Sequence, residues 1–167
     1  MSKVNPRFFP LTGFFALIVG VILFDQVTKI ATLDHFLKDP QPLSLFPFFD
    51  LVLVWNRGVS WGMFNNLGAY NALIFSSLSG LICVFLGFWL WQAPNKWMAA
   101  ILSLIIGGAI GNMIDRLRFG GVVDFLHFHW HGYSFPAFNI ADAAITIGVA
   151  LMILQEIKNI KKEKVNK

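Results

Sequence analysis

The sequence predicts a small all-α membrane protein, with four transmembrane helices and a small β-containing segment outside the membrane. Of its 167 residues, 56% are hydrophobic and 13% are charged, whereas a soluble domain carries roughly 45–50% apolar and about 25% charged residues. A chain this short has too little interior to bury so much apolar surface. These observations exclude an ordinary soluble domain and a disordered chain. A disulfide scaffold is also excluded, because Cys83 is the single cysteine.

Four apolar stretches approach the roughly 20 residues that a membrane helix needs. We expect helices at about 11–33, 68–91, 97–117 and 138–157, all within one membrane-embedded domain, residues 1–167. The third stretch holds Gly107, Gly108 and Gly111, and such small residues allow helices to approach closely. A cleaved signal peptide is the competing interpretation of the first stretch. The retained helix is favoured, because no small-residue cleavage site follows the apolar core.

Basic residues gather before the first helix, between the second and third, and after the fourth. Eight of the 13 lie there: Lys3, Arg7, Lys96, Lys158, Lys161, Lys162, Lys164 and Lys167. The positive-inside rule therefore places both termini and the basic tail 158–167 in the cytoplasm. Segments 34–67 and 118–137 then lie on the outer side, and the alternation around Leu51–Trp55 predicts short strands in the first of them. The net charge of +4 indicates contact with anionic lipid, not with nucleic acid.

Polar residues stand at the outer ends of three expected helices, because consecutive helices run in opposite directions. They are Asp25, Lys29, Asn112, Asp115, Arg116, Asn139 and Asp142, and Asp124 follows the third helix closely. Asp25–Lys29 and Asp115–Arg116 form candidate structural ion pairs, since neutralisation is the usual requirement at membrane depth. Asp124 and Asp142 have no basic partner in their own segments.

Two unpaired carboxylates at one depth allow several interpretations. They can share a proton and so supply a base and an acid, as in aspartic proteases. They can instead line a proton or ion pathway, or take part in structural pairing. A transporter or channel is disfavoured, because the carboxylates cluster toward one face and no internal repeat is visible. A non-enzymatic membrane scaffold is the remaining alternative.

The outer segments carry two further patterns. His127, His129 and His131 alternate along the chain, so on a strand they would share one face, which invites a metal site. No fourth ligand is evident, and we predict neither a metal nor a cofactor. The first outer segment is rich in aromatic residues, which suit either interfacial anchoring or a movable cover. In the second case Gly58 and Gly62 serve as hinges and Trp61 contacts the substrate.

Five motifs in order along the chain resemble the lipoprotein signal peptidase family, also called signal peptidase II. They are Asp25-Gln-Val-Thr-Lys29, Asn56-Arg57-Gly58, Gly107-Gly-Ala-Ile-Gly-Asn-Met-Ile-Asp-Arg116, Val122-Val-Asp-Phe125 and Phe138-Asn-Ile-Ala-Asp142. The resemblance covers nearly the whole chain. Two departures, Val59-Ser60-Trp61 in place of Ala-Ala-Phe and Ala143 in place of Ser, bear on subsite shape and not on the reaction.

The resemblance implies an aspartic peptidase of the bacterial inner membrane that cuts prolipoproteins just before their diacylglyceryl-modified cysteine. It assigns the catalytic pair to Asp124 and Asp142, near the periplasmic face. It also implies that Asn56, Asn112, Arg116 and Asn139 line the site and that Asp25, Lys29 and Asp115 support its geometry. We add Gly58, Trp61 and Ala141 to the expected substrate-binding or supporting residues. Expected partners are lipidated precursors, membrane lipids and globomycin-type peptide inhibitors, and we expect a monomer.

Overall fold

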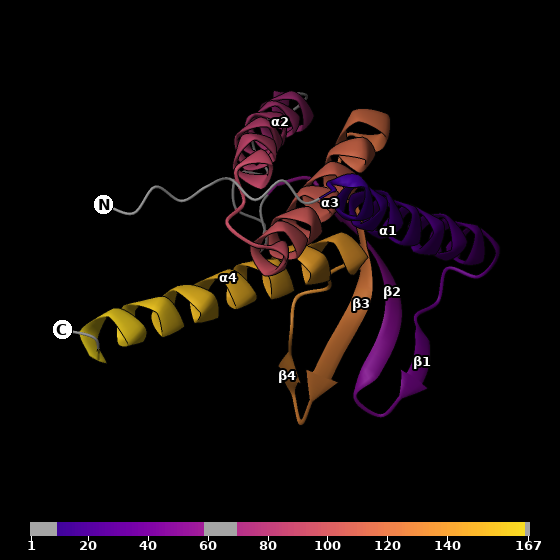
Figure 1. Ribbon diagram of the computed structural model, residues 1–167. Helices are drawn as coiled ribbons and strands as arrows, with labels where there is room; N and C mark the ends of the chain where they lie inside the picture. The colour runs from indigo at the N-terminus through magenta and orange to yellow at the C-terminus, as the bar shows by residue number, and fades with distance from the viewer. Residues whose placement is uncertain (1–9, 59–69, 166–167) are drawn as a thin grey trace.

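Four long apolar helices form the body of the protein, in agreement with the predicted fold class (Figure 1). The computed structural model describes residues 10–58 and 70–165. Its helices are α1 (Thr12–Lys38), α2 (Tyr70–Trp91), α3 (Lys96–Phe119) and α4 (Ile140–Val165). Each is long and apolar enough to cross a membrane. The predicted membrane spans are therefore all present as helices.

Two helices run well beyond their predicted ends, by five residues or more. Helix α1 continues past the apolar stretch to Lys38, where the side chain of Lys38 pairs with Asp34 one turn earlier at 2.7 Å. Helix α4 continues through the lysine-rich segment to Val165, although we expected a separate tail from residue 158. Lysine is a good helix former, and its charge is favourable near a helix C-terminus. Hydropathy alone marks where a span ends, but not where a helix ends.

A four-stranded antiparallel sheet combines both predicted outer segments. Its strands are β1 (Leu43–Phe46), β2 (Phe49–Asn56), β3 (Val122–Trp130) and β4 (Tyr133–Ser134), in the order β1-β2-β3-β4. The sequence predicts strands only in segment 34–67, whereas segment 118–137 supplies the other two. His131 and Gly132 join β3 to β4 with φ values of 44° and 83°. Positive φ at both positions is typical of the tight turn that suits a hairpin.

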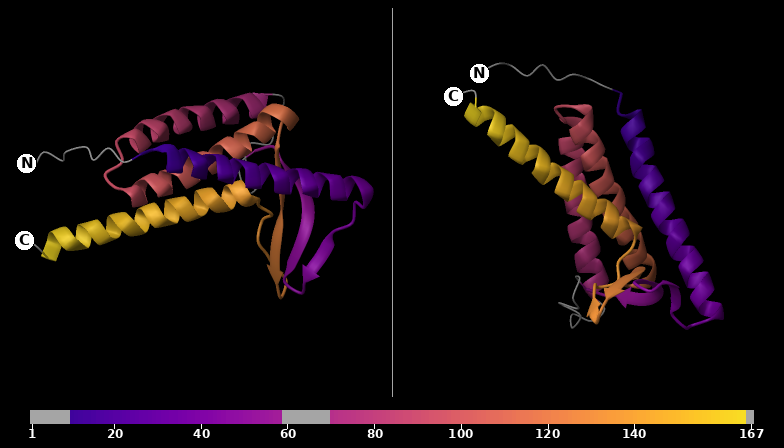
Figure 2. Two further views of the ribbon diagram at one scale, coloured as in Figure 1. Left: turned by 45° about the vertical axis from the view of Figure 1, so that its right-hand side comes forward. Right: turned by 90° about the horizontal axis from the view of Figure 1, so that it is seen from below.

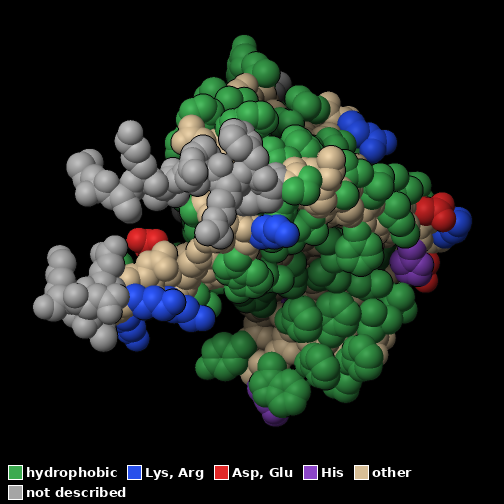
Figure 3. Space-filling model, viewed as in Figure 1, with side chains coloured by type: hydrophobic (Ala, Val, Ile, Leu, Met, Phe, Trp, Pro, Cys, Tyr) green, Lys and Arg blue, Asp and Glu red, His purple; other side chains and the backbone are tan. Residues whose placement is uncertain are grey.

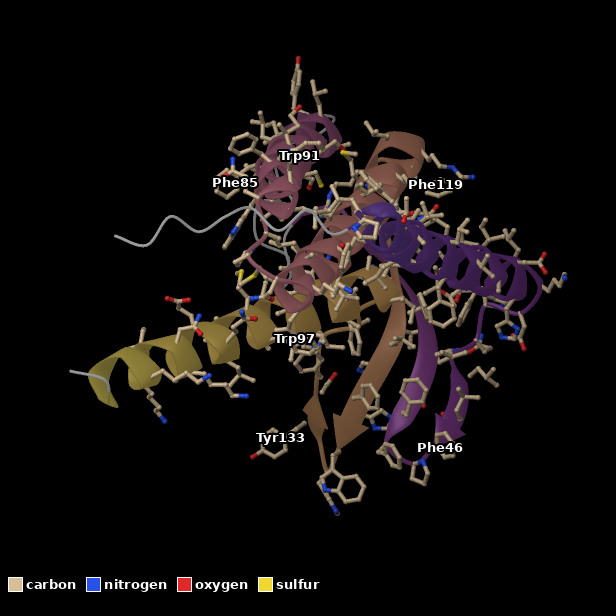
Figure 4. All side chains as sticks on the ribbon, in the orientation of Figure 1. Phe46, Phe85, Trp91, Trp97, Phe119 and Tyr133 are labelled. Carbon is tan, nitrogen blue, oxygen red and sulfur yellow. The ribbon has the colours of Figure 1, made fainter. Side chains whose placement is uncertain are left out.

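The sheet lies across one end of the helix bundle. Figures 1 and 2 show that α1 begins and α4 ends at the opposite end, where the turn between α2 and α3 also lies. Phe46 on β1 and Tyr133 on β4 project from the two outer strands (Figure 4). At the C-terminal end of α4, the exposed lysines Lys158, Lys161 and Lys162 form a basic patch (Figure 3). The bundle therefore has a basic end and an aromatic end.

Helix α3 is the centre of the bundle. Of its most apolar stretch, 67% is buried, against 17% in each of the other three helices. Its glycines make this position possible: a Cβ on Gly107 would lie 2.8 Å from the Val21 side chain, and one on Gly111 would lie 2.7 Å from an Asp25 carboxylate oxygen. Close helix approach through small residues is thus observed as predicted. The apolar side chains that dominate the outer surface (Figure 3) suit contact with lipid.

Candidate active site

A cluster of buried polar side chains lies where the helices meet the sheet. Its residues come from α1, from α3, from the last residue of β2, from the beginning of β3 and from the start of α4. Its least exposed members have at most 2% of their surface accessible: Asp25, Lys29, Asp115, Asp124 and Asn139. Charged groups are rarely buried so fully without partners, so the contacts within the cluster decide what it can do.

Lys29 is the centre of a buried ion cluster. Its Nζ lies 2.8 Å from Asp25 and 2.9 Å from Asp115, and it donates to the Asn112 side-chain oxygen at 3.0 Å. The predicted Asp25–Lys29 pair is therefore observed. The predicted Asp115–Arg116 pair is wrong, because the structure describes an ion pair of Asp115 with Lys29 and none with Arg116. Successive residues on a helix point about 100° apart, so these two neighbours face different partners.

The two carboxylates of this ion cluster also hold the backbone beside the predicted catalytic pair. Asp25 accepts a hydrogen bond from the Ala141 backbone N–H at 2.9 Å. Asp115 accepts one from the Val123 backbone N–H at 3.1 Å. Each of these backbone groups directly precedes one of the two aspartates, Asp142 or Asp124. The ion cluster therefore fixes the chain positions from which both aspartates project.

Gln26 belongs to the same network, although it is not among the predicted site residues. Its side-chain amide donates to Asp115 at 2.9 Å, to Asp25 at 3.2 Å and to the Gly111 carbonyl at 3.3 Å. A polar side chain next to Asp25 in an otherwise apolar helix was the available signal. Gln26 thus helps to join α1 to α3.

Asp142 stands in a reciprocal cap at the start of α4. The Asn139 side-chain oxygen accepts a hydrogen bond from the Asp142 backbone N–H at 2.9 Å, and an Asp142 carboxylate oxygen accepts one from the Asn139 backbone N–H at 3.3 Å. This is the geometry of a capping box, with an aspartate in the third helical position. The Asn112 side chain donates to the other Asp142 oxygen at 2.7 Å.

Asp124 projects from β3 into the same network. One carboxylate oxygen accepts from the Asn139 side chain at 2.7 Å, and the other accepts from the Asn56 side chain at 3.1 Å. Burial first, and then the charge of Asp142, raise the pKa of Asp124 from 3.8 to about 7, against the lowering effect of these two hydrogen bonds. The structure therefore brings Asp124 and Asp142 together, with Asn139 bonded to both.

The remaining predicted residues surround this pair. The half-buried Arg116 guanidinium donates to the Asn112 carbonyl at 3.4 Å and to the Gly58 carbonyl at 3.5 Å, and it lies 5.7 Å from the centre of the Phe75 ring. Its Nε is buried and has no hydrogen-bond partner among the described residues. Ala141 is fully buried. Trp61 and Gly62 lie outside the described residues.

An apolar cleft of about 560 Å³ opens beside Asp142. It is lined by the segment before α4 and by the first turns of that helix, including Phe138, Ile145 and Thr146. The Asp142 carboxylate thus lines one side of the cleft, and mostly apolar side chains line the other sides. Such a site can hold an apolar chain with a polar group at its end.

The chain matches proteins of one family over most of its length. The sequence model of the family described as "Signal peptidase (SPase) II" matches residues 17–158. The chain belongs to the signal peptidase II family. The lipoprotein signal peptidase of Methylobacterium radiotolerans is 43% identical over 87% of this chain and 85% of its own length. That of Burkholderia multivorans is 44% identical over 84% and 85%.

A solved structure supports the same assignment for this signal peptidase II family member. It is described as a bacterial membrane enzyme determined by the in meso method at 1.9 Å resolution, and it superposes with a TM-score of 0.78 at 32% identity. The superposition covers 92% of this chain and 98% of the solved one. The family and the four spanning helices together indicate a multi-pass membrane peptidase.

Proposed function

We propose that the chain is an aspartic endopeptidase that removes the signal peptide from diacylglyceryl-modified prolipoproteins, cutting just before the lipidated cysteine. The observation that carries this proposal is the pair Asp124 and Asp142, two carboxylates from different elements bonded to one asparagine. The names of the relatives supply the substrate class. Asp124 and Asp142 are then the catalytic residues.

The pair supplies both halves of acid–base catalysis. Because the pKa of Asp124 is about 7, this group both holds and releases a proton readily near neutral pH. A water bound between the carboxylates gives its proton to the ionised member, and its oxygen attacks the scissile carbonyl carbon. The protonated member donates to the developing oxyanion. As the C–N bond breaks, a carboxyl proton passes to the leaving amine.

Substrate binding follows from the walls of the site. The diacylglyceryl group lies in the apolar cleft along α4, which opens beside Asp142. Arg116 and Gly58 bind the substrate backbone, since the Arg116 Nε is buried without a partner among the described residues. Anchoring through acyl chains orients the peptide and lowers the entropic part of the barrier. Globomycin-type cyclic peptides occupy the same site.

The supporting residues act through position. Asp25, Lys29 and Asp115 hold the backbone of Ala141 and Val123, next to the two catalytic residues. Asn56, Asn112 and Asn139 donate directly to the two catalytic carboxylates and so fix their orientation. Neither a metal nor a cofactor takes part in this reaction.

The distribution of charge supports an orientation in the bacterial inner membrane. The basic end of the bundle lies in the cytoplasm together with both termini, as the positive-inside rule requires. The sheet and the catalytic pair then lie near the periplasmic face. The described residues assigned to the site meet within one chain, which supports a monomer as the active unit.

The deciding experiment is cleavage of a lipidated precursor by the purified protein, followed on a gel. Asp124→Asn and Asp142→Asn each abolish cleavage while leaving the folded protein in the membrane. Asp34→Asn is the matched control, because Asp34 is 65% exposed and pairs only with Lys38 among the described residues. Near-normal turnover by either catalytic variant would remove that residue from the pair.

A further inference from the structure

A stripe of polar side chains crosses one face of the sheet, away from the catalytic pair. Strand register places Ser44 opposite Asp50, Asp50 opposite His127, and His129 opposite Ser134. Side chains opposite one another, or two apart on one strand, share a face. The stripe therefore joins all four strands. The other face carries aromatic side chains, such as the Phe49 and Phe128 rings stacked at 4.7 Å.

Three groups in this stripe converge on one point. An Asp50 carboxylate oxygen lies 2.9 Å from His129 Nε2 and 3.9 Å from His127 Nδ1. The three candidate donor atoms all lie within 4.8 Å of one another. Both of these ring nitrogens are buried; His127 Nδ1 has no hydrogen-bond partner among the described residues, whereas His129 Nε2 contacts the Asp50 carboxylate. A buried polar atom without a partner is costly and calls for an explanation, and His127 Nδ1 faces the same carboxylate oxygen that His129 contacts.

In His127 and Asp50, the polar atom that points away from this cluster is held by a serine hydroxyl. His127 Nε2 lies 2.7 Å from the Ser134 hydroxyl, and the second Asp50 oxygen accepts a hydrogen bond from the Ser44 hydroxyl at 2.7 Å. Outer partners of this kind orient metal ligands and set which imidazole nitrogen is free to coordinate. The Ser134 contact thus leaves His127 Nδ1 facing Asp50.

We propose that Asp50, His127 and His129 form a divalent transition-metal site, for which Zn²⁺ is the best match. Two imidazoles and one carboxylate are typical zinc ligands, with bonds of about 2.0–2.2 Å and tetrahedral geometry. Ligand atoms in such a tetrahedron are about 3.3 Å apart, so the observed separations need side-chain adjustments of roughly 1 Å. Water fills the fourth position. Imidazole ligands favour Zn²⁺ over Mg²⁺ or Ca²⁺, which prefer oxygen.

The set of ligands differs from the one that the sequence suggested. His131 lies in the turn between β3 and β4 with a φ of 44°, outside the three-residue group. Asp50 replaces it and comes from a strand far away in the sequence. The proposed metal site thus departs from the expectation that the protein binds no metal.

A metal here would join β2 to β3. Asn56 ends β2 and Asp124 lies on β3, and these two residues are hydrogen-bonded to each other. Metal binding would fix the relative position of the two strands that carry them. The metal site does not depend on the proposed peptidase function.

The test is titration of zinc chloride into the detergent-purified full chain after removal of metals with EDTA. We expect one equivalent to bind by calorimetry. Loss of an outer-shell partner typically costs 10–100-fold in metal affinity, so loss of a ligand in Asp50→Asn or His129→Ala should cost at least about 100-fold. His131→Ala is the matched control and keeps wild-type affinity. Absence of binding by the wild type, unchanged binding by the ligand variants, or equal loss in the control would each overturn the site.

A second measurement needs no substitution. Histidines of the wild-type protein are modified with diethylpyrocarbonate, with and without zinc chloride, and the modified positions are read by mass spectrometry. Zinc should protect His127 and His129 while leaving His131 and His35 reactive. Uniform protection, or none, contradicts the proposal. Cleavage of the lipidated precursor is measured in parallel, so failure of the metal site and failure of the peptidase function are distinguishable.

Discussion

Replacing Asp124 by asparagine should stabilise the folded protein at alkaline pH while abolishing cleavage. The pKa of Asp124 rises from 3.8 to about 7 in the fold. This difference of about 3 units corresponds to about 4 kcal/mol that disfavours the ionised carboxylate, at 1.36 kcal/mol per unit. Between these pH values the folded state binds more protons than the unfolded state, so the stability of the wild type falls as the pH rises from about 4 to about 7.

The asparagine side chain carries no charge at any pH, so the variant does not lose stability through ionisation at position 124 as the pH rises. An amide resembles a protonated carboxyl in shape, but its NH2 group cannot accept a hydrogen bond as both Asp124 oxygens do. Near pH 4 the variant should therefore be less stable than the wild type by about 1–3 kcal/mol. Above pH 8 the variant should be more stable by roughly 4 kcal/mol, less the cost of one imperfect hydrogen bond of about 1–3 kcal/mol. The sign of the change follows from burial of the carboxylate, which is 2% exposed.

The measurement is unfolding in detergent at a series of pH values, followed by the fluorescence of the six tryptophans. The decisive quantity is the difference in free energy of unfolding between variant and wild type, plotted against pH. It should rise by roughly 4 kcal/mol between about pH 4 and pH 8. Asp34→Asn, at a 65% exposed position, should show no such rise. A difference that is independent of pH, or that falls with pH, would refute the reasoning.

Three further outcomes are expected. Cleavage of a lipidated precursor should fall by about tenfold per pH unit above pH 7, because Asp124 then loses the proton that it donates; a flat alkaline limb in the rate profile would contradict this. Lys29→Met should destabilise the fold by about 3–5 kcal/mol, since it leaves two carboxylates buried without their cation, and unfolding in detergent measures the loss. Gly108→Ala should cost about 1–3 kcal/mol, because the added Cβ meets the backbone of α4. Gly87→Ala is its control in the same assay, as nothing lies within 4 Å there; equal effects would show that helix packing is not responsible.

The sequence was most informative where the signal is local. Hydropathy located all four helices. The alternating direction of consecutive spans predicted that Asp25, Asn112 and Asp142 lie at one level. The spacing of Asp25 and Lys29 also predicted their ion pair. Membrane insertion makes these predictions strong, because each span must satisfy its backbone hydrogen bonds internally and bury its charges with partners.

The sequence was least informative about partners far apart in the chain. Asp115 pairs with Lys29 on another helix rather than with its neighbour Arg116. Likewise, Asp50 meets two histidines only because β2 and β3 are neighbours in the sheet. A one-residue change of register would turn these side chains to opposite faces, so no local pattern could have assigned them.

The amino-acid order by itself thus determined the number of spans, their alternation and the two carboxylates that lack a local partner. Tertiary structure alone decided that Asn139 bonds to both of those carboxylates and that backbone groups beside them are held by the ion cluster of α1 and α3. The physical reason is the distance along the chain over which each interaction acts. Hydrophobic transfer and backbone hydrogen bonding act on contiguous residues, whereas hydrogen bonds of about 3 Å between side chains exist only after packing has chosen which elements meet.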